Sequence, residues 1–260
     1  MDVYVTGSNS SFLSSDVLTE FAGRGDKVHV LPLSFSEFYT NYNNEPEYAL
    51  DDYMIYGGLP AVSLMKTPEQ KASYLKTQLQ NVYLKDIVEI NHLNSDENIG
   101  ELFDIIASGI FFLTNPTEPG NIFKSITKTS LSALTINRYI TYMQEMLSKA
   151  KRYDVKEKKY IGSPYKIYFE DVGLQNAQLD FRQTEENHLM ENIIYNERRY
   201  RGYNVDVGVV DTRENVNGSS ERRQLEIDFV ANQESKRYYI QSAYDITNED
   251  KMKQKNEIIR

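Results

Sequence analysis

The first apolar runs of the chain are short, and a helical pattern separates them. Val3 to Val5 predicts a strand that ends in a turn of small polar residues, Gly7 to Ser10. A helix is expected from about Ser14 to Gly23, followed by a second strand over Val28 to Val30. This order is typical of an open α/β sheet, which binds ligands at the carboxyl ends of its strands. The polar turn is therefore the first candidate site.

Helical patterns fill the middle of the chain and end at a pair of short strands. A long helix is expected over 70–90 and is interpreted as a linker, because its apolar residues keep helical spacing. The next elements are expected in this order: helices over 99–113, 121–126 and 132–147, then antiparallel strands over 158–161 and 165–169, joined by Gly162 to Pro164. Three helices followed by a β-hairpin describe a winged helix, whose third helix would contact DNA.

From His188 the pattern changes to one helix and three strands. The elements are expected in this order: a helix over 188–201, a strand over 203–210, a polar loop over 213–221, and strands over 225–230 and 238–241. Glu191 lies on the helix, Asp228 on the second strand and Gln241 on the third. Glu226 alternates with Asp228, so both side chains are expected on one face of their strand.

This C-terminal layout is similar to the PD-(D/E)XK nuclease-like fold. The resemblance implies that Glu191, Asp228 and Gln241 are the catalytic residues. Asp228, Glu226 and Gln241 are the expected ligands of a Mg²⁺ or Mn²⁺ ion, because such hard ions prefer oxygen ligands.

One position departs from that fold. Its active members carry a Lys two residues after the third-strand position, where this chain has Ala243. Lys236 and Lys251 are possible substitutes, although the spacing supports neither. We expect a degenerate site with weak metal binding, and an active metal-dependent DNA nuclease is the alternative.

Composition limits the class of protein. The chain has 260 residues, 40% of them hydrophobic and 26% charged, which is an ordinary soluble balance. No apolar run approaches the roughly 20 residues of a transmembrane helix, so no membrane association is expected. The absence of Cys excludes disulfides and thiolate metal sites and agrees with a cytoplasmic location. The net charge of −9 argues against a generally basic surface that coats nucleic acid.

Basic residues are nevertheless concentrated in one segment, 149–160, which holds six of them against two acidic residues. Together with the outward face of the helix that begins at Ser132, this segment is a candidate DNA interface. The residues expected to contact nucleic acid are Arg138, Lys156, Lys158 and Lys159. Two alternatives stay open: the lysines solvate a hairpin edge, or the winged helix binds protein rather than DNA.

Three motifs carry a second resemblance. Thr6 to Ser10, Gly23-Arg24 and Pro32 to Phe38 stand in the order found at the end of the ATPase core of bacterial and archaeal AAA+-type ATP-binding proteins. The chain is similar to that family, and the resemblance implies that Asn9 and Arg24 sense the nucleotide. Full-length members also carry a winged helix and a C-terminal domain of unknown function with nuclease-like topology. Further matching segments are Gly57 to Pro60, Tyr83 to Asp86, Tyr168 to Leu174, Met190 to Asn192 and Glu226 to Val230.

The phosphate-binding elements of that family are missing. The chain contains no G-x-x-x-x-G-K-[ST] sequence and no apolar run that ends in an Asp-Glu pair able to hold Mg²⁺. ATP and Mg²⁺ are therefore implied as cofactors of full-length relatives. We expect the chain to be a piece of a longer ATPase, or a truncated copy, that does not hydrolyse ATP.

The expected fold class is α/β and α+β multidomain. Its expected parts are the remnant of a P-loop ATPase core over 1–45, a helical linker over 46–95, a winged helix over 96–180 and a nuclease-like α/β domain over 181–260. The expected function is that of a bacterial, cytoplasmic AAA+-type protein that is DNA-associated or regulatory. The alternatives are a non-enzymatic module that binds nucleic acid or protein, and a metal-dependent DNA nuclease.

Overall fold

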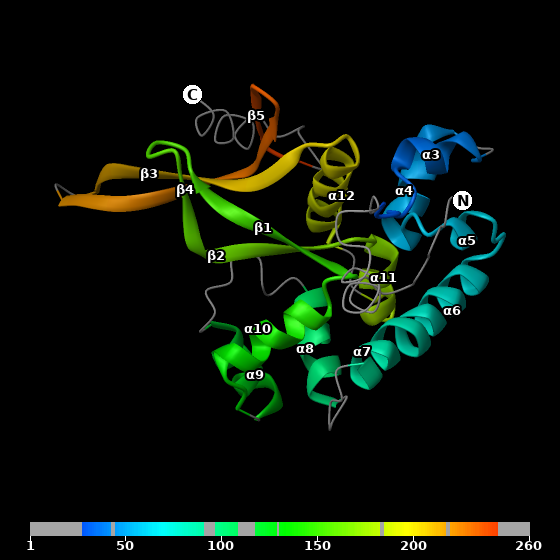
Figure 1. Cartoon of the computed structure of the whole chain (residues 1–260). Helices are drawn as coiled ribbons and strands as arrows, with labels where there is room; N and C mark the ends of the chain where they lie inside the picture. The colour runs from blue at the N-terminus through cyan, green and yellow to red at the C-terminus, as the bar shows by residue number, and fades with distance from the viewer. Residues whose placement is uncertain are drawn as a thin grey trace, which may run out of the picture. The chain divides into compact units, whose positions relative to one another are not determined.

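The computed structural model describes residues 28–42, 45–90, 97–108, 118–128, 130–182, 185–216 and 219–243 (Figure 1). The helices in these ranges are α3 (Phe35–Thr40), α4 (Pro46–Tyr56), α5 (Pro60–Ser63), α6 (Pro68–Gln78), the π-helical η1 (Leu79–Leu84), α7 (Lys85–Ile90), α8 (Glu97–Ala107), α9 (Glu118–Thr127), α10 (Ala133–Tyr142), α11 (Val172–Gln178) and α12 (Glu186–Tyr200). The strands are β1 (Leu147–Asp154), β2 (Lys159–Phe169), β3 (Asn204–Val216), β4 (Ser219–Gln233) and β5 (Lys236–Ile240). The expected mixture of α and β structure is confirmed. Among these helices, none combines the length and apolar character that crossing a bilayer requires.

The strands form one five-stranded sheet in the order β2-β1-β3-β4-β5. β1 runs parallel to β3, and the other neighbouring pairs are antiparallel. Strands from both sides of the expected boundary at residue 180 therefore belong to the same sheet. Contacts divide the chain after Leu31, and all the helices and strands named above lie in the unit Pro32–Arg260.

The expected position of the first hairpin turn is wrong. Tyr153 pairs with Tyr160, so the turn lies between these residues, where Lys158 adopts a φ of 54°. Gly162 to Pro164 instead lies inside β2. β2 is an edge strand, and an edge strand tolerates proline because one side of its backbone pairs with no other strand.

The polar loop expected over 213–221 is also wrong, because β3 and β4 continue through it. Val216 pairs with Ser219, which leaves only the Asn-Gly dipeptide between the two strands. This dipeptide strongly favours a two-residue hairpin connection, so the polar residues around it can extend the strands.

The helices expected between residues 70 and 142 are present, although residues 109–113 of the second lie outside the described residues. The helix expected over 132–147 is too long, because α10 ends at Tyr142 and Leu147 begins β1. α6, η1 and α7 follow one another without a break, as the linker helix predicts. Ser132 caps α10, its hydroxyl accepting a hydrogen bond from the Thr135 backbone N–H at 3.0 Å. Phe103 of α8 and Phe169 of β2 lie in the same buried core, so these helices pack directly on the sheet.

The segment 39–52, which is acidic and Asn-rich, contains most of α4. Pro46 occupies the first turn of this helix, where the missing N–H costs nothing. Ala49 and Tyr53 are buried against α3 and α12. The acidic and Asn-rich composition of the segment does not indicate this core.

α12 covers one face of the sheet (Figure 1). The ring of Tyr195 stacks on that of Tyr168 in β2, with centroids 4.0 Å apart and planes 16° apart. Val205, Val207 and Phe229 complete this third core from β3 and β4. The helix is thereby held over the strands that carry the candidate acidic residues.

Candidate functional site

The acidic residues expected on the strand over 225–230 lie beside a β-bulge. Asp206 pairs with Val230 and Gly208 with Ile227, so β4 holds one residue more than β3 across this step. A Cβ on Gly208 would lie 2.8 Å from Val230 Cγ2 and 2.9 Å from Ile227 Cβ, so only glycine fits. Bulges redirect side chains and are common near functional sites. Asp228 is one of the residues in this bulge.

The cation among the carboxylates is the ammonium group of Lys166 on β2. Its Nζ lies 2.6 Å from Glu191 Oε1 and 3.0 Å from Glu226 Oε1. The Lys166 side chain is 5% exposed, so its charge depends on these two partners rather than on water. The Tyr168 hydroxyl donates a further hydrogen bond of 2.6 Å to Glu191 Oε1.

The Asp228 carboxylate accepts hydrogen bonds from the two residues that follow β5, Gln241 and Ser242. The Gln241 side-chain amide donates to Asp228 Oδ1 at 2.8 Å. Asp228 Oδ2 accepts from the Ser242 backbone N–H at 2.7 Å and from its hydroxyl at 2.8 Å. Both carboxylate oxygens therefore already hold hydrogen bonds within the protein.

The charge states follow from burial and from these partners. Burial raises the pKa of Glu191, and the charge of Asp228 adds to the increase, whereas Lys166 and Tyr168 oppose it. Burial lowers the pKa of Lys166, but Glu191 and Glu226 more than compensate, and its pKa ends above the ordinary value. Lys166 is therefore held as an ammonium ion, which neutralises part of the cluster.

The structure thus brings the four expected residues into one site. Asp228 and Gln241 touch directly, while Glu191 and Glu226 are joined through Lys166. Within the described ranges, no group of three or more His, Cys, Asp or Glu side chains is arranged to hold a metal ion. The Mg²⁺ or Mn²⁺ site remains a prediction.

The cation of this site was missed at the sequence level. Ala243 occupies the position where a Lys was expected. Of its two possible substitutes, Lys236 is exposed at the start of β5 and Lys251 lies outside the described residues. Lys166 comes from a strand assigned to the winged helix, so no spacing rule links it to Asp228. The available signal is a single Lys within the otherwise apolar and aromatic run from Tyr165 to Phe169.

Lys166→Met is expected to cost about 2 kcal/mol of unfolding free energy at pH 8, because Glu191 stays buried without its cation. A carboxyl group whose folded-state pKa is raised stabilises the fold most below its ordinary pKa of about 4.3, and this stability is lost as pH rises through the folded pKa. The cost should therefore shrink between pH 8 and pH 5 in urea unfolding. Lys149→Met, which removes an exposed lysine of β1, is the control with little pH dependence. A cost for Lys166→Met that does not change with pH would contradict this assignment.

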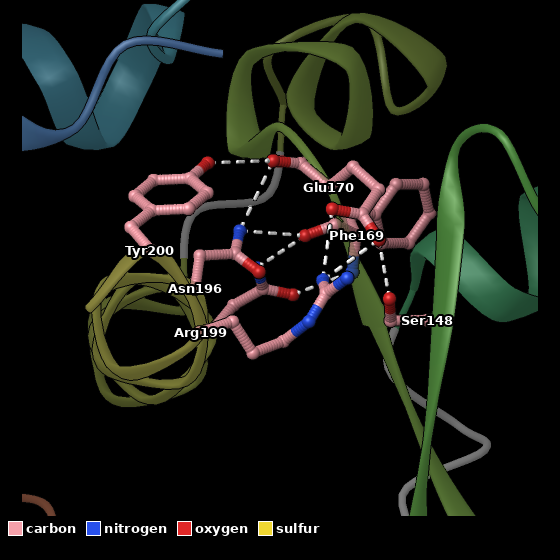
Figure 2. A network of polar contacts seen from close by, with 7 residues as sticks. Ser148, Phe169, Glu170, Asn196, Arg199 and Tyr200 are labelled. Atoms are coloured by element: carbon pink, nitrogen blue, oxygen red, sulfur yellow. Dashed lines mark hydrogen bonds and ion pairs between the residues drawn. The ribbon is translucent and has the colours of Figure 1, made fainter. Parts of the chain in front are cut away.

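A second polar network joins the end of β2 to α12 (Figure 2). Arg199 Nη1 lies 2.7 Å and 2.8 Å from the two carboxylate oxygens of Glu170, which also accepts from the Ser148 hydroxyl. The Asn196 amide donates to the carbonyl oxygens of Phe169 and Glu170, at 2.8 Å and 3.1 Å. These contacts fix α12, and therefore Glu191, relative to the sheet.

The next residue, Asp171, connects this network to Gly57-Gly58 at the end of α4, which is called the glycine turn below. Its carboxylate accepts from the backbone N–H groups of Gly58 at 2.7 Å, Gly173 at 2.8 Å and Leu174 at 3.2 Å. The last two bonds cap the start of α11. Complete burial raises the pKa of Asp171 to about 6, against the effect of these hydrogen bonds.

The segment before α3 is bound to the same turn and to α12. The Leu33 backbone N–H donates to the Gly58 carbonyl at 2.8 Å, and the Tyr53 hydroxyl donates to the Leu33 carbonyl at 2.7 Å. The Phe35 N–H donates to Glu197 Oε1 of α12 at 2.7 Å. The Pro32 to Phe38 motif is therefore part of the unit that carries the acidic site.

The expected nucleic-acid residues fall into two groups. Arg138 is exposed on α10, while three lysines lie at the turn between β1 and β2. These are Lys156, Lys158 and Lys159. The Lys156 ammonium donates to the Asp211 carbonyl at 2.6 Å, and Lys159 pairs with Glu157. Contact of all four residues with DNA remains a prediction, and the nucleotide-sensing residues Asn9 and Arg24 lie outside the described residues.

Two known families match separate parts of the chain. Residues 47–185 match the family described as Domain of unknown function (DUF8612), and the chain belongs to this family because the match covers more than half of it. Residues 1–39 match the AAA domain, so the resemblance of the first residues to AAA-type proteins is supported. The winged-helix and nuclease-like assignments remain predictions.

Relatives extend over nearly all of the chain. An uncharacterized protein of Haemophilus influenzae is 29% identical over 252 residues, which cover 94% of this chain and 60% of the relative. Uncharacterized protein MJ1544 of Methanocaldococcus jannaschii is 25% identical over 264 residues, covering 96% of this chain and 57% of the relative. The chain spans less than two thirds of the length of these relatives. No solved structure matches it.

Proposed function

We propose that the chain is the regulatory part of an AAA-type ATP-binding protein and does not itself turn over ATP. One observation carries the proposal. The AAA match ends at residue 39, and its last residues, including Leu33 and Phe35, are hydrogen-bonded into the unit that contains the 47–185 family match. A conformational change in the AAA part would therefore reach this unit through the segment that contains Leu33 and Phe35.

The route from that segment to the acidic site is short. Phe35 is bound to Glu197 of α12, and the same helix carries Arg199 and Glu191. A shift of α12 would therefore act on the Glu170–Arg199 pair and on the partners of Glu191 together. This arrangement supports coupling between a nucleotide-binding part and the C-terminal strands, because a packed helix moves as one rigid element.

A regulatory role is also favoured over nuclease activity. Lys166 already neutralises Glu191 and Glu226, and Asp228 is satisfied by Gln241 and Ser242. In a metal-dependent nuclease these oxygens would instead be open to a divalent ion and a water molecule.

The chain is expected to release no phosphate from ATP in the presence of Mg²⁺, because it lacks the loop and the lysine that hold the phosphates. The measurement is a phosphate-release assay on the purified chain beside Arg24→Ala. Both proteins should match the protein-free rate. Mg²⁺-dependent release that Arg24→Ala abolishes would show that the chain hydrolyses ATP and would overturn the proposal.

A further inference from the structure

The sheet carries a cluster of tyrosines and cations on the face opposite α12. Val205 and Val207 pack in one core with Tyr195 of α12, so Asp206 between them faces the other side of the sheet. The Tyr160 hydroxyl donates to Asp206 Oδ2 at 3.1 Å, which places Tyr160 on this opposite face as well.

Cations lie beside the tyrosines of this face. Lys151 Nζ is 5.7 Å from the ring centroid of Tyr160, and the Arg237 guanidinium is 4.7 Å from that of Tyr153. The Tyr153 and Tyr160 rings meet edge to face with centroids 5.5 Å apart. Arg237 Nη1 donates to the Tyr153 hydroxyl at 2.9 Å. Tyr239 of β5 pairs with Val230, which pairs with Asp206, so Tyr239 lies on the same face. These five residues, Lys151, Tyr153, Tyr160, Arg237 and Tyr239, are called the tyrosine surface below.

Two rings of the tyrosine surface and its two cations face solvent, whereas the Tyr153 ring is buried. Tyr160 is 58% exposed and Tyr239 38% exposed, and the side chains of Lys151 and Arg237 are exposed beside them. Asp206, the carboxylate within the cluster, is 7% exposed and is already bound to Tyr160. Its charge is also offset by Lys151 and Arg237. The outward charge of this surface is therefore positive in a chain whose net charge is −9.

We propose that the tyrosine surface binds single-stranded nucleic acid. Unpaired bases stack on aromatic rings, and cations beside the rings contact the phosphates that connect the bases. The two exposed rings, Tyr160 and Tyr239, lie on the edge strands β2 and β5, so a single strand that crosses this face can stack one base on each ring. A duplex hides the faces of its bases and would contact only the cations. This inference goes beyond the proposed function. The residues that it assigns to nucleic-acid binding differ from Arg138 of α10, which is expected to contact duplex DNA.

The test is fluorescence anisotropy of an end-labelled oligothymidine of about 15 nucleotides, titrated with the full chain at low salt. The single strand should bind more tightly than a duplex of the same length. Tyr160→Ala and Tyr239→Ala should each weaken binding about tenfold, because each removes one stacking platform. Arg237→Gln should flatten the dependence of affinity on salt.

Three controls separate stacking from other effects. Tyr160→Phe keeps the ring but loses the bond to Asp206, and it should bind like the parent chain. Tyr48→Ala removes a tyrosine that is 65% exposed on α4, and Arg138→Ala removes an exposed cation on α10; neither should change single-strand binding. The proposal is overturned if the oligonucleotide does not bind, if duplex binds equally well, or if folded Tyr160→Ala binds like the parent chain.

Discussion

The Gly57→Ala variant should lose about 4 kcal/mol of unfolding free energy, enough to unfold many domains of ordinary stability. Gly57 has a φ of 73° and a ψ of −165°, a conformation that strains any residue with a Cβ. The added Cβ would also lie 2.1 Å from Asp171 Oδ1. That carboxylate is held by the N–H groups of Gly58, Gly173 and Leu174, so it cannot move aside without leaving buried donors unpaired.

The matched control is Gly100→Ala in α8. No atom lies within 4 Å of a Cβ built at Gly100, and alanine is favoured over glycine in a helix by about 0.5–1 kcal/mol. Urea unfolding followed by circular dichroism should show opposite effects for the two variants. A loss below about 1 kcal/mol for Gly57→Ala would mean that the glycine turn can rearrange, and that its contact with Asp171 is dispensable.

Arg199→Ala should cost about 3 kcal/mol, because it leaves the Glu170 carboxylate buried without its cation. Glu170 is 7% exposed at its side chain, and both of its oxygens accept from Arg199 Nη1. The Ser148 hydroxyl remains, but a single neutral donor replaces little of a charge-assisted pair.

Arg201→Ala on the same helix is the control. Arg201 pairs with Glu197 at 2.7 Å and its side chain is 53% exposed, so its loss should cost less than about 1 kcal/mol. Combining Glu170→Gln with Arg199→Ala should recover part of the stability lost by Arg199→Ala, because no buried charge is then left unpaired. If the double variant is less stable than Arg199→Ala by the full cost of Glu170→Gln, the two residues do not interact.

The helices were predictable because their signals are local. Apolar residues at helical spacing mark α8, α10 and α12, and Ser132 marks the start of α10 through a hydrogen bond three residues away. The same local reading failed at β1. Leu147 continues the apolar face of the preceding helix, and only its pairing with Phe169 on β2 makes it part of a strand.

The candidate site was only partly predictable, for a related reason. Alternation along one strand placed Glu226 with Asp228, and the expected layout placed Gln241 beside them. Lys166 reaches Glu226 across 60 positions of sequence, and Gly58 reaches Asp171 across 113. Partners at such distances are set by the order of strands in the sheet, which single-sequence periodicity does not contain.

β2 serves two cores at once, because its side chains alternate between them. Ile167 and Phe169 pack with the helices α8 to α10, while Tyr168 packs with Tyr195 of α12. Separating the chain at residue 180 would strip β1 of its pairing with β3 and expose Tyr168. Loss of either core removes the support of the other, so residues on both sides of that boundary should melt in one cooperative transition.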